Sequence, residues 1–178
     1  GRIFVGVRFR PGAAADVLGL QGAELADARV GVSVLWGRAE MERLESRLAD
    51  CTSPAQTADV LQDIVAARVR ELPDPAVEAV VAALRARDAT VAGLAERIGP
   101  SERQLLRRCT SALGYGPKTL GRILRFQRFR TLAAARAGAG LAELAADAGY
   151  ADQPHLTREC IRLAGVTPAA FLALPEDV

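Results

Sequence analysis

Residues 117–136 read PKTLGRILRFQRFRTLAAAR and predict one long helix that is rich in basic residues. The segments on either side of it resemble each other: residues 91–120 read VAGLAERIGPSERQLLRRCTSALGYGPKTL, and residues 141–171 read LAELAADAGYADQPHLTRECIRLAGVTPAAF. Matching positions are 50 apart up to Gly99 and Gly149, and 51 apart after one extra residue in the second segment. So many matches in one register indicate a duplicated helical unit joined by a basic helix.

The composition predicts a mainly α, soluble protein. The chain has 178 residues and half of them are apolar, but only 4% are aromatic, so the core must consist mostly of Leu, Val and Ala. Apolar spacings of three and four favour helices over strands. No apolar run is long enough to span a membrane, and no basic-then-apolar leader opens the chain. We therefore expect a cytoplasmic protein without a membrane segment.

No metal site, disulfide or other cofactor is expected. The chain has three cysteines, and none lies at CxxC spacing. Cys109 and Cys160 occupy matching positions on an apolar helix face, which predicts buried small hydrophobic residues. His155 is the single histidine of the chain, so it has no second histidine with which to bind a metal.

Residues 1–72 predict a small helical region with one strand at its start. Residues 2–9, RIFVGVRF, alternate apolar and polar side chains as a half-buried strand does. Because one strand cannot form a sheet, we expect its partners in a β domain that precedes residue 1 in a longer protein. Helices are expected at residues 13–18, 38–49 and 54–71, the last with Ser53 as its N-cap, and a loop at residues 30–36. Trp36 is interpreted as a core residue, a contact to the missing region, or part of a ligand pocket.

Residues 73–178 predict two helix-turn-helix subdomains, after a boundary at Pro73 and Pro75. The first subdomain covers about residues 90–114. It follows a helix at residues 75–87 and has helices at 91–98 and from Ser101 onward, with Thr90 and Ser101 as caps, Gln104 completing a capping box, and Gly99 at positive φ in the turn. Leu105 faces the core. A helix–turn–helix of this kind is a common DNA-binding motif.

The second subdomain covers about residues 140–164 and repeats this construction. Its helices are expected at residues 141–148 and from the Asp152 cap to about residue 163, with Pro154 in the first turn. The long helix at 117–136 joins the two subdomains, and a last short helix starts at Thr167 and ends near residue 174.

Basic side chains concentrate in residues 97–136, which contain ten of them and a single acid, Glu102. This charge is a plausible footprint for a polyanion, although the net charge of the whole chain is only +2. Arg103 and Arg107 are four apart and project from one helix face, so they can reach neighbouring base pairs in a major groove. Gln104 and Arg108 lie in the same run. The alternative is a basic helix face that is merely solvated.

The second subdomain and the joining helix contribute further candidates. Gln153, His155, Thr157 and Arg158 lie on the second helix of the second subdomain, where Arg158 matches Arg107. His155 can read a base or a phosphate, or can be a surface histidine without a role. Lys118, Arg122 and Arg125 recur on one side of the joining helix and are candidates for phosphate contacts, with simple solvation as the alternative.

Residues 91–174 resemble the DNA-binding domain of the AraC/XylS family of transcription regulators. The resemblance rests on LAERIGPSERQLLRRC, GYGPKTLGRILRFQRF, ELAADAGYADQPHLTREC and GVTPAAF. It implies two helix-turn-helix units held by a long linker helix, with their second helices in successive major grooves. It also implies that residues 1–72 are the end of an N-terminal sensory region through which a small-molecule effector acts, with RNA polymerase as a further partner.

Family positions transfer to this sequence one residue at a time. The base-reading residues become Arg103, Leu106 and Arg107 in the first unit, and Gln153, Pro154, His155 and Arg158 in the second. Family members often have polar residues where Leu106 and Pro154 stand, so these two are expected to touch a thymine methyl or no base at all. Cys109 and Cys160 replace the usual core phenylalanine, which leaves smaller cores for their neighbours to fill.

The sequence therefore predicts a sequence-specific regulator that binds double-stranded DNA, and an activator, as family members often are. The main alternative is a helical protein-interaction module whose basic face binds an acidic partner. An enzyme is not expected, because the sequence has no Gly-rich phosphate loop, no GxSxG and no HExxH. A regulator fused to a repair methyltransferase would need a reactive cysteine, and the only candidate, Cys51, has no activating partner near it in sequence.

Overall fold

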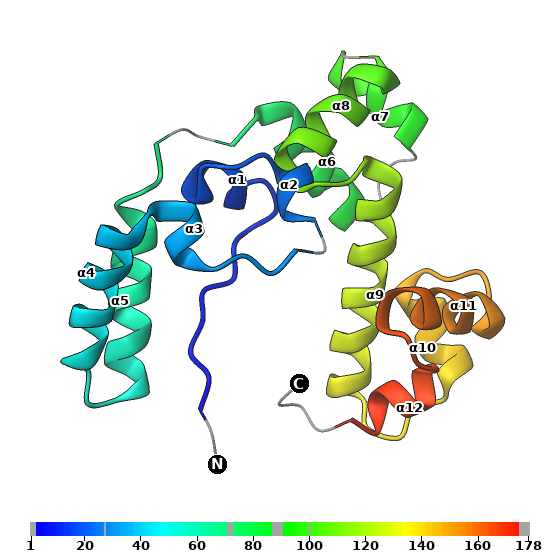
Figure 1. Ribbon diagram of the computed structural model, residues 1–178. Helices are drawn as coiled ribbons and strands as arrows, with labels where there is room; N and C mark the ends of the chain where they lie inside the picture. Colours follow the sequence, from blue (N-terminus) through cyan, green and yellow to red (C-terminus); the bar gives the residue numbers. More distant parts are fainter. Residues whose placement is uncertain (1–2, 27, 71–72, 87–90, 100, 175–178) are drawn as a thin grey trace. The chain divides into compact units, whose positions relative to one another are not determined.

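The chain is mainly helical in the computed structural model, which describes residues 3–26, 28–70, 73–86, 91–99 and 101–174 (Figure 1). Helices and no strand are found in these ranges. The chain divides into two compact units, residues 1–117 and residues 118–178.

The predicted N-terminal strand is wrong. Residues 3–10 form an irregular segment that ends in a turn at Pro11. A strand is stable only when a neighbouring strand pairs with its backbone, and none of the described residues supplies one. Ile3 is 74% exposed, and Val5, Val7 and Phe9 of the same alternating face are only partly buried, so the described part of the chain does not cover this face fully.

Three short helices follow, of which only the first was predicted. They are α1 (Ala14–Leu18), α2 (Gly22–Leu25) and α3 (Val32–Trp36). In α2, the capping box formed by Gln21 and Glu24 substitutes for a long apolar pattern. The predicted loop at 30–36 is wrong, because α3 occupies most of it. The helix was missed because five residues are too few to show a helical periodicity. Trp36 is partly buried, with the Arg68 guanidinium carbon 4.1 Å from its ring centroid.

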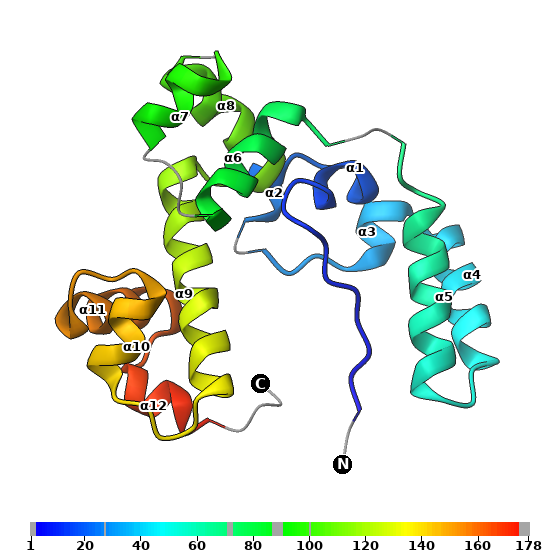
Figure 2. The same cartoon turned by 180° about the vertical axis from the view of Figure 1, so that it is seen from behind.

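The helices α4 (Arg38–Ala49) and α5 (Pro54–Ala66) lie side by side, as both views show (Figures 1 and 2). The predicted cap of α5 is confirmed, because the Ser53 hydroxyl accepts a hydrogen bond from the Gln56 backbone N–H at 3.3 Å. The helix ends at Ala66 and not near residue 71, which lies outside the described residues. Val69 therefore lies beyond the helix and is 54% exposed.

The rest of the first unit consists of α6 (Pro75–Ala86), α7 (Val91–Ile98) and α8 (Glu102–Leu113). Val77, Val80, Leu94 and Leu105 are at most 1% exposed and form the core of this part. The predicted Thr90 cap and the end of the first of these helices at residue 87 lie outside the described residues.

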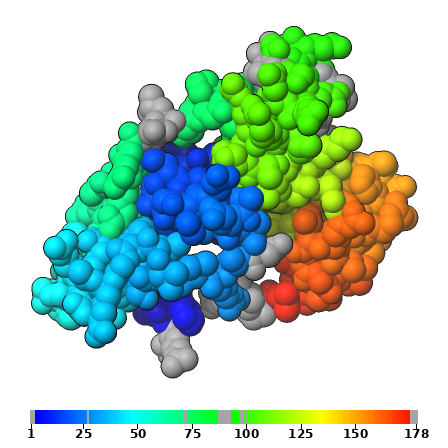
Figure 3. Space-filling view, turned by 45° about the horizontal axis from the view of Figure 1, so that its top comes forward, coloured from blue at the N-terminus to red at the C-terminus, as the bar shows by residue number. Residues whose placement is uncertain are grey.

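The end of α8 packs against the short helix α2, and the surfaces of the two segments meet in Figure 3. The contact is made by backbone. A methyl group on Gly22 would come within 2.7 Å of the Leu113 carbonyl carbon and would overlap the Gly114 nitrogen. Gly114 itself adopts φ +85° as the C-cap of α8. Two glycines are therefore required for this close approach.

The second unit contains nearly all of α9 (Pro117–Ala135), followed by α10 (Leu141–Ala148), α11 (Gln153–Ala164) and α12 (Pro168–Leu172). Its core joins Phe129 of α9 to residues of α10, of α11 and of the turn between them: Leu144, Ala145, Ala148, Tyr150 and Leu156. The long helix is thus confirmed, whereas its function as a spacer stays a prediction.

The repeat in the sequence is also a repeat of local structure. The helices α7 and α10 have eight residues each and start 50 residues apart, and α8 and α11 have twelve each and start 51 apart. Gly99 and Gly149 have φ values of 91° and 93° in the two turns, which confirms the predicted conformation of Gly99. The predicted burial of Cys109 and Cys160 is also confirmed, because both are 0% exposed.

Candidate nucleic-acid interface

The first half of α8 presents a basic, exposed face above a sealed core. Leu105 and Cys109 point inward with no exposed surface. Arg103, Leu106 and Arg107 are exposed, so the structure brings together the three residues that the resemblance assigns to base reading in the first unit. Leu106 is 52% exposed, and its Cδ1 lies where Gly116 leaves room, because a methyl group there would come within 2.5 Å.

Two other predicted residues of α8 have bonds within the protein. The Gln104 side-chain oxygen accepts a hydrogen bond from the Ser101 backbone N–H at 2.9 Å, which confirms the predicted capping box. The Arg108 guanidinium forms an ion pair with Asp74 at 3.3 Å, and the same carboxylate oxygen accepts a bond from the Ala76 backbone N–H at 2.8 Å. Arg108 thereby fixes α8 to the start of α6.

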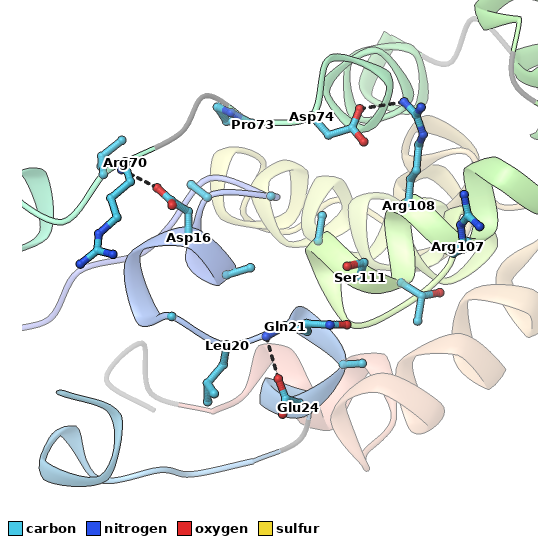
Figure 4. A pocket seen from close by; sticks show the side chains of 18 residues that line it. Asp16, Leu20, Gln21, Glu24, Arg70, Pro73, Asp74, Arg107, Arg108 and Ser111 are labelled. Carbon is cyan, nitrogen blue, oxygen red and sulfur yellow. Dashed lines mark hydrogen bonds and ion pairs between the residues drawn. The ribbon is translucent and has the colours of Figure 1, made fainter. Parts of the chain in front are cut away.

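An open cleft of about 1280 Å³ lies beside this face in the first unit (Figure 4). Arg107, Arg108 and Ser111 of α8 border it on one side, and Asp16 and Gln21 of the N-terminal segment border it on the other. The Arg70 backbone N–H donates a hydrogen bond to the Asp16 carboxylate at 2.8 Å, which holds the N-terminal side of the cleft in place. Local sequence patterns could not predict this cleft, because its walls come from segments far apart in the chain.

The start of α11 is organised by the predicted Asp152 cap. Its carboxylate accepts a hydrogen bond from the His155 backbone N–H at 2.6 Å. The His155 ring is also held in place, because Nδ1 accepts a bond from the Ala151 backbone N–H at 3.3 Å and the ring meets Tyr150 edge-on at 5.2 Å between centroids. The Nδ1 atom of His155 thus has a local structural role, and any contact to another molecule would have to come from Nε2.

The remaining predicted residues of α11 divide into two groups. Gln153, Pro154 and Arg158 are exposed. Thr157 is partly buried, and its hydroxyl donates to the Gln153 carbonyl at 3.0 Å. His155 and Arg158 line a shallow hollow of about 400 Å³ together with Arg162, a residue that the sequence analysis missed although it lies four residues after Arg158.

The basic residues of α9 have different surroundings. Lys118 is exposed. The Arg122 Nε donates to the Glu159 carboxylate of α11 at 2.6 Å, and the Glu159 residue is only 8% exposed. Glu159 was missed as well, although it lies three residues after Leu156 and one before Cys160, on the face of α11 that faces the core. An acid on a core-facing stripe is a signal for a buried partner.

Burial raises the pKa values of four groups near these helices, namely Cys109, Tyr115, Tyr150 and Cys160. Burial and, to a lesser extent, the nearby Asp74 carboxylate raise the pKa of the Cys109 thiol from 9.0 to about 11. Burial also raises the pKa of Cys160. Burial raises the pKa of Tyr150 to about 12, although Arg125 opposes this. These thiols and the phenol are therefore neutral core groups at neutral pH.

A metal site is not evident, because the described residues contain no group of three or more His, Cys, Asp or Glu side chains that could hold an ion. Among the same residues, no helix has both the length and the apolar character needed to cross a bilayer.

Comparison with known proteins finds a match in the C-terminal half of the chain. A family model described as a helix-turn-helix domain matches residues 94–173. The match supports an AraC-type helix-turn-helix DNA-binding domain here, and with it a DNA-binding transcription regulator. No curated protein and no solved structure matches the chain.

Proposed function

We propose that this chain is a sequence-specific transcription regulator that inserts α8 and α11 into successive segments of the major groove of double-stranded DNA. The observation that supports two reading helices is their equivalence. Both have twelve residues, both start at a capped N-terminus, and both bury a Leu and a Cys at matching positions. Arg107 and Arg158 also match, and both are exposed.

The contacts of each side chain suggest its role at the DNA. Arg103 and Arg107 of α8, with Arg158 of α11, can form bidentate bonds to guanine, and Gln153 can bond to adenine. Leu106 and Pro154 are exposed and apolar, so each offers at most an apolar contact to a thymine methyl group. His155 can donate from Nε2 to a base or a phosphate, because its Nδ1 is occupied.

The other predicted site residues have mainly structural roles in this proposal. Gln104 completes the capping box of α8, the Thr157 hydroxyl donates to the Gln153 carbonyl, and Arg108 joins α8 to α6. Lys118 keeps its proposed role as a phosphate contact, because it is exposed at the start of α9.

Selection of bound sequences from a random duplex pool, performed with the full chain, tests this proposal. We expect a site of two half-elements whose centres are about one helical turn apart, roughly 10 base pairs. The selected duplex should then bind at least about 10³-fold more tightly than a random duplex at physiological salt. An equal affinity for both duplexes would contradict sequence-specific recognition and would favour the alternative in which the basic helices bind an acidic protein.

We also propose that the regulator activates transcription by contacting RNA polymerase, and that residues 1–72 transmit the signal of a small-molecule effector. The support is the resemblance of residues 91–174 to a family whose members are often activators. Transcription in vitro from a promoter that carries the selected site tests the direction of regulation: added protein should increase the transcript, and a decrease would indicate a repressor.

A further inference from the structure

We infer that Arg122, Arg125 and Glu159 are positioning residues that set the orientation of α11, and that this side of α9 is not a phosphate-binding surface. The inference rests on the proposed function, because it concerns how the second reading helix is presented. It revises the expectation from the sequence, in which Arg122 and Arg125 were candidates for phosphate contacts.

The central contact is the ion pair between Arg122 of α9 and Glu159 of α11. The donor and acceptor are 2.6 Å apart, and the two side chains are 28% and 11% exposed. A carboxylate that is this far from solvent needs a partner, because an unpaired charge would be strongly destabilising. The geometry therefore holds the core-facing side of α11 against one point on α9.

Two more arginines of α9 continue the row at intervals of three residues. The Arg125 guanidinium carbon lies 5.4 Å from the ring centroid of Tyr150, which is 4% exposed and in turn contacts His155 edge-on. Arg128 donates to the Ala148 carbonyl at 3.3 Å, at the end of α10. The three arginines thus contact α11, the turn and α10 in order, and each interaction has a physical basis in an ion pair, a cation–π contact or a helix C-terminus.

Because Glu159 is next to Arg158 in α11, the ion pair between Arg122 and Glu159 also sets the direction in which Arg158 points. Glu159 follows Arg158 directly, so the two side chains point about 100° apart around the helix. When Glu159 is held on α9, Arg158 is fixed on the exposed side of α11, while both residues border the hollow that His155 and Arg162 also line. A rotation of α11 about its axis would break the ion pair and misdirect Arg158 together.

Removal of the Glu159 carboxylate should have opposite effects on DNA binding, depending on whether Arg122 positions α11 or binds phosphate. If Arg122 bound phosphate, removal of the competing Glu159 charge would strengthen DNA binding. If the pair positions α11, Glu159→Ala and Arg122→Ala should have the same effect, namely a loss of at least about tenfold in the preference for the correct second half-element. The preference at the first half-element should be unchanged in both variants.

Titrations of the selected duplex at several salt concentrations give the direct test. Lys118→Ala is the matched control on the same helix and should reduce the slope of log affinity against log salt by about 0.9. Arg122→Ala should leave that slope unchanged. Tighter binding by Glu159→Ala, or a fall in slope for Arg122→Ala similar to that of the control, would overturn the inference while the proposed function stood.

A measurement without DNA completes the test. Each single variant should lower the melting temperature, and the double variant should lower it no further than the larger single effect, because both remove one interaction. Glu159→Gln, which keeps the shape of the side chain, replaces Glu159→Ala if the latter does not fold. Additive losses would overturn the pairing, whereas a wild-type chain that prefers no duplex would overturn the proposed function.

Discussion

The helix pairs α7–α8 and α10–α11 have the same framework but are held in place differently. Their turns, caps and buried Leu and Cys residues match position by position. However, α8 is held at its end by the backbone of α2 and at Arg108 by Asp74, whereas α11 is held at Glu159 by Arg122 of α9. Buried positions were thus kept in both copies, while the contacts that orient each helix differ.

This difference shows that a repeat can preserve a motif without preserving its support. The position that matches Glu159 in the first copy is Arg108, an opposite charge. Each of the two residues pairs with a group outside its own helix pair, and the partner lies in a different part of the chain. The two helices should therefore respond differently to matched substitutions.

The largest expected difference concerns the glycines that end α8 and α11. Gly165→Ala should cost roughly 1–2 kcal/mol, because φ is +74° but no atom lies within 4 Å of the added methyl group. Gly114→Ala should cost roughly 2–5 kcal/mol, because the methyl group would also overlap the Gly22 carbonyl oxygen. Denaturant unfolding, followed by amide exchange in each helix, measures both losses.

Gly22→Ala is the control for the contact itself, since it adds the same overlap without changing a residue of α8. Equal losses for the substitutions at the two helix ends would mean that α2 moves away at little cost. The difference between the two supports would then disappear.

A smaller difference is expected in DNA recognition. Arg107→Ala and Arg158→Ala should each weaken binding to the selected duplex by roughly 1–3 kcal/mol and relax specificity at one base pair. The affected base pair should lie in a different half-element for each variant. Binding titrations with duplexes altered at single positions measure this, and equal losses for every sequence would reduce both residues to phosphate contacts.

High pH should lower the stability of both units, through Cys109 in the first unit and through Tyr150 in the second. Because the folded pKa of Cys109 is raised to about 11, its stabilisation is complete below pH 9 and is lost as the pH rises to 11. The contribution of Tyr150 is complete below pH 10 and is lost as the pH rises to about 12. Each loss should be roughly 2–3 kcal/mol, because each folded pKa is raised by about 2.

Tyr150→Phe isolates the contribution of the second unit. It should reduce the loss of stability between pH 10 and 12 in denaturant unfolding and leave the part due to Cys109 and Tyr115. It should change stability little at pH 7, because the phenol oxygen is buried without a hydrogen-bond partner among the described residues. A large loss at pH 7 would show that the hydroxyl group is needed for the fold.

The smallest expected difference concerns the cysteines. In the native chain, a thiol reagent at pH 8 should modify partly buried Cys51 rapidly, and should modify Cys109 and Cys160 equally slowly because both are buried. Cys51→Ser should remove the rapid reaction. Faster modification of Cys109 than of Cys160 would indicate that the first helix pair opens more readily.

The sequence predicts well what depends on neighbours along the chain. The caps of Ser53, Ser101 and Asp152 and the burial of the two matching cysteines follow from local spacing, and all are confirmed. The strand at residues 2–9 failed because a strand depends on a distant partner. The short helix α3 was missed because five residues show no period.

The sequence predicted the exposed residues of the candidate site but not the partly buried ion pair that supports them. Exposure of Arg103, Arg107 and Arg158 follows from their positions relative to buried residues on the same helix. The ion pair between Arg122 and Glu159 depends on how α9 and α11 pack across 37 residues of chain, which no local pattern encodes. Spacing alone therefore assigned Arg122 to a solvent-facing row.

The arginine row on α9 limits how this protein can be engineered. A hybrid chain that received α10 and α11 from another protein would place them against three arginines that here contact Glu159, Tyr150 and the Ala148 carbonyl. Such an exchange should therefore require the transfer of α9 together with α10, α11 and α12, whose Phe171 packs on the same core, so that the smallest portable segment is residues 117–172.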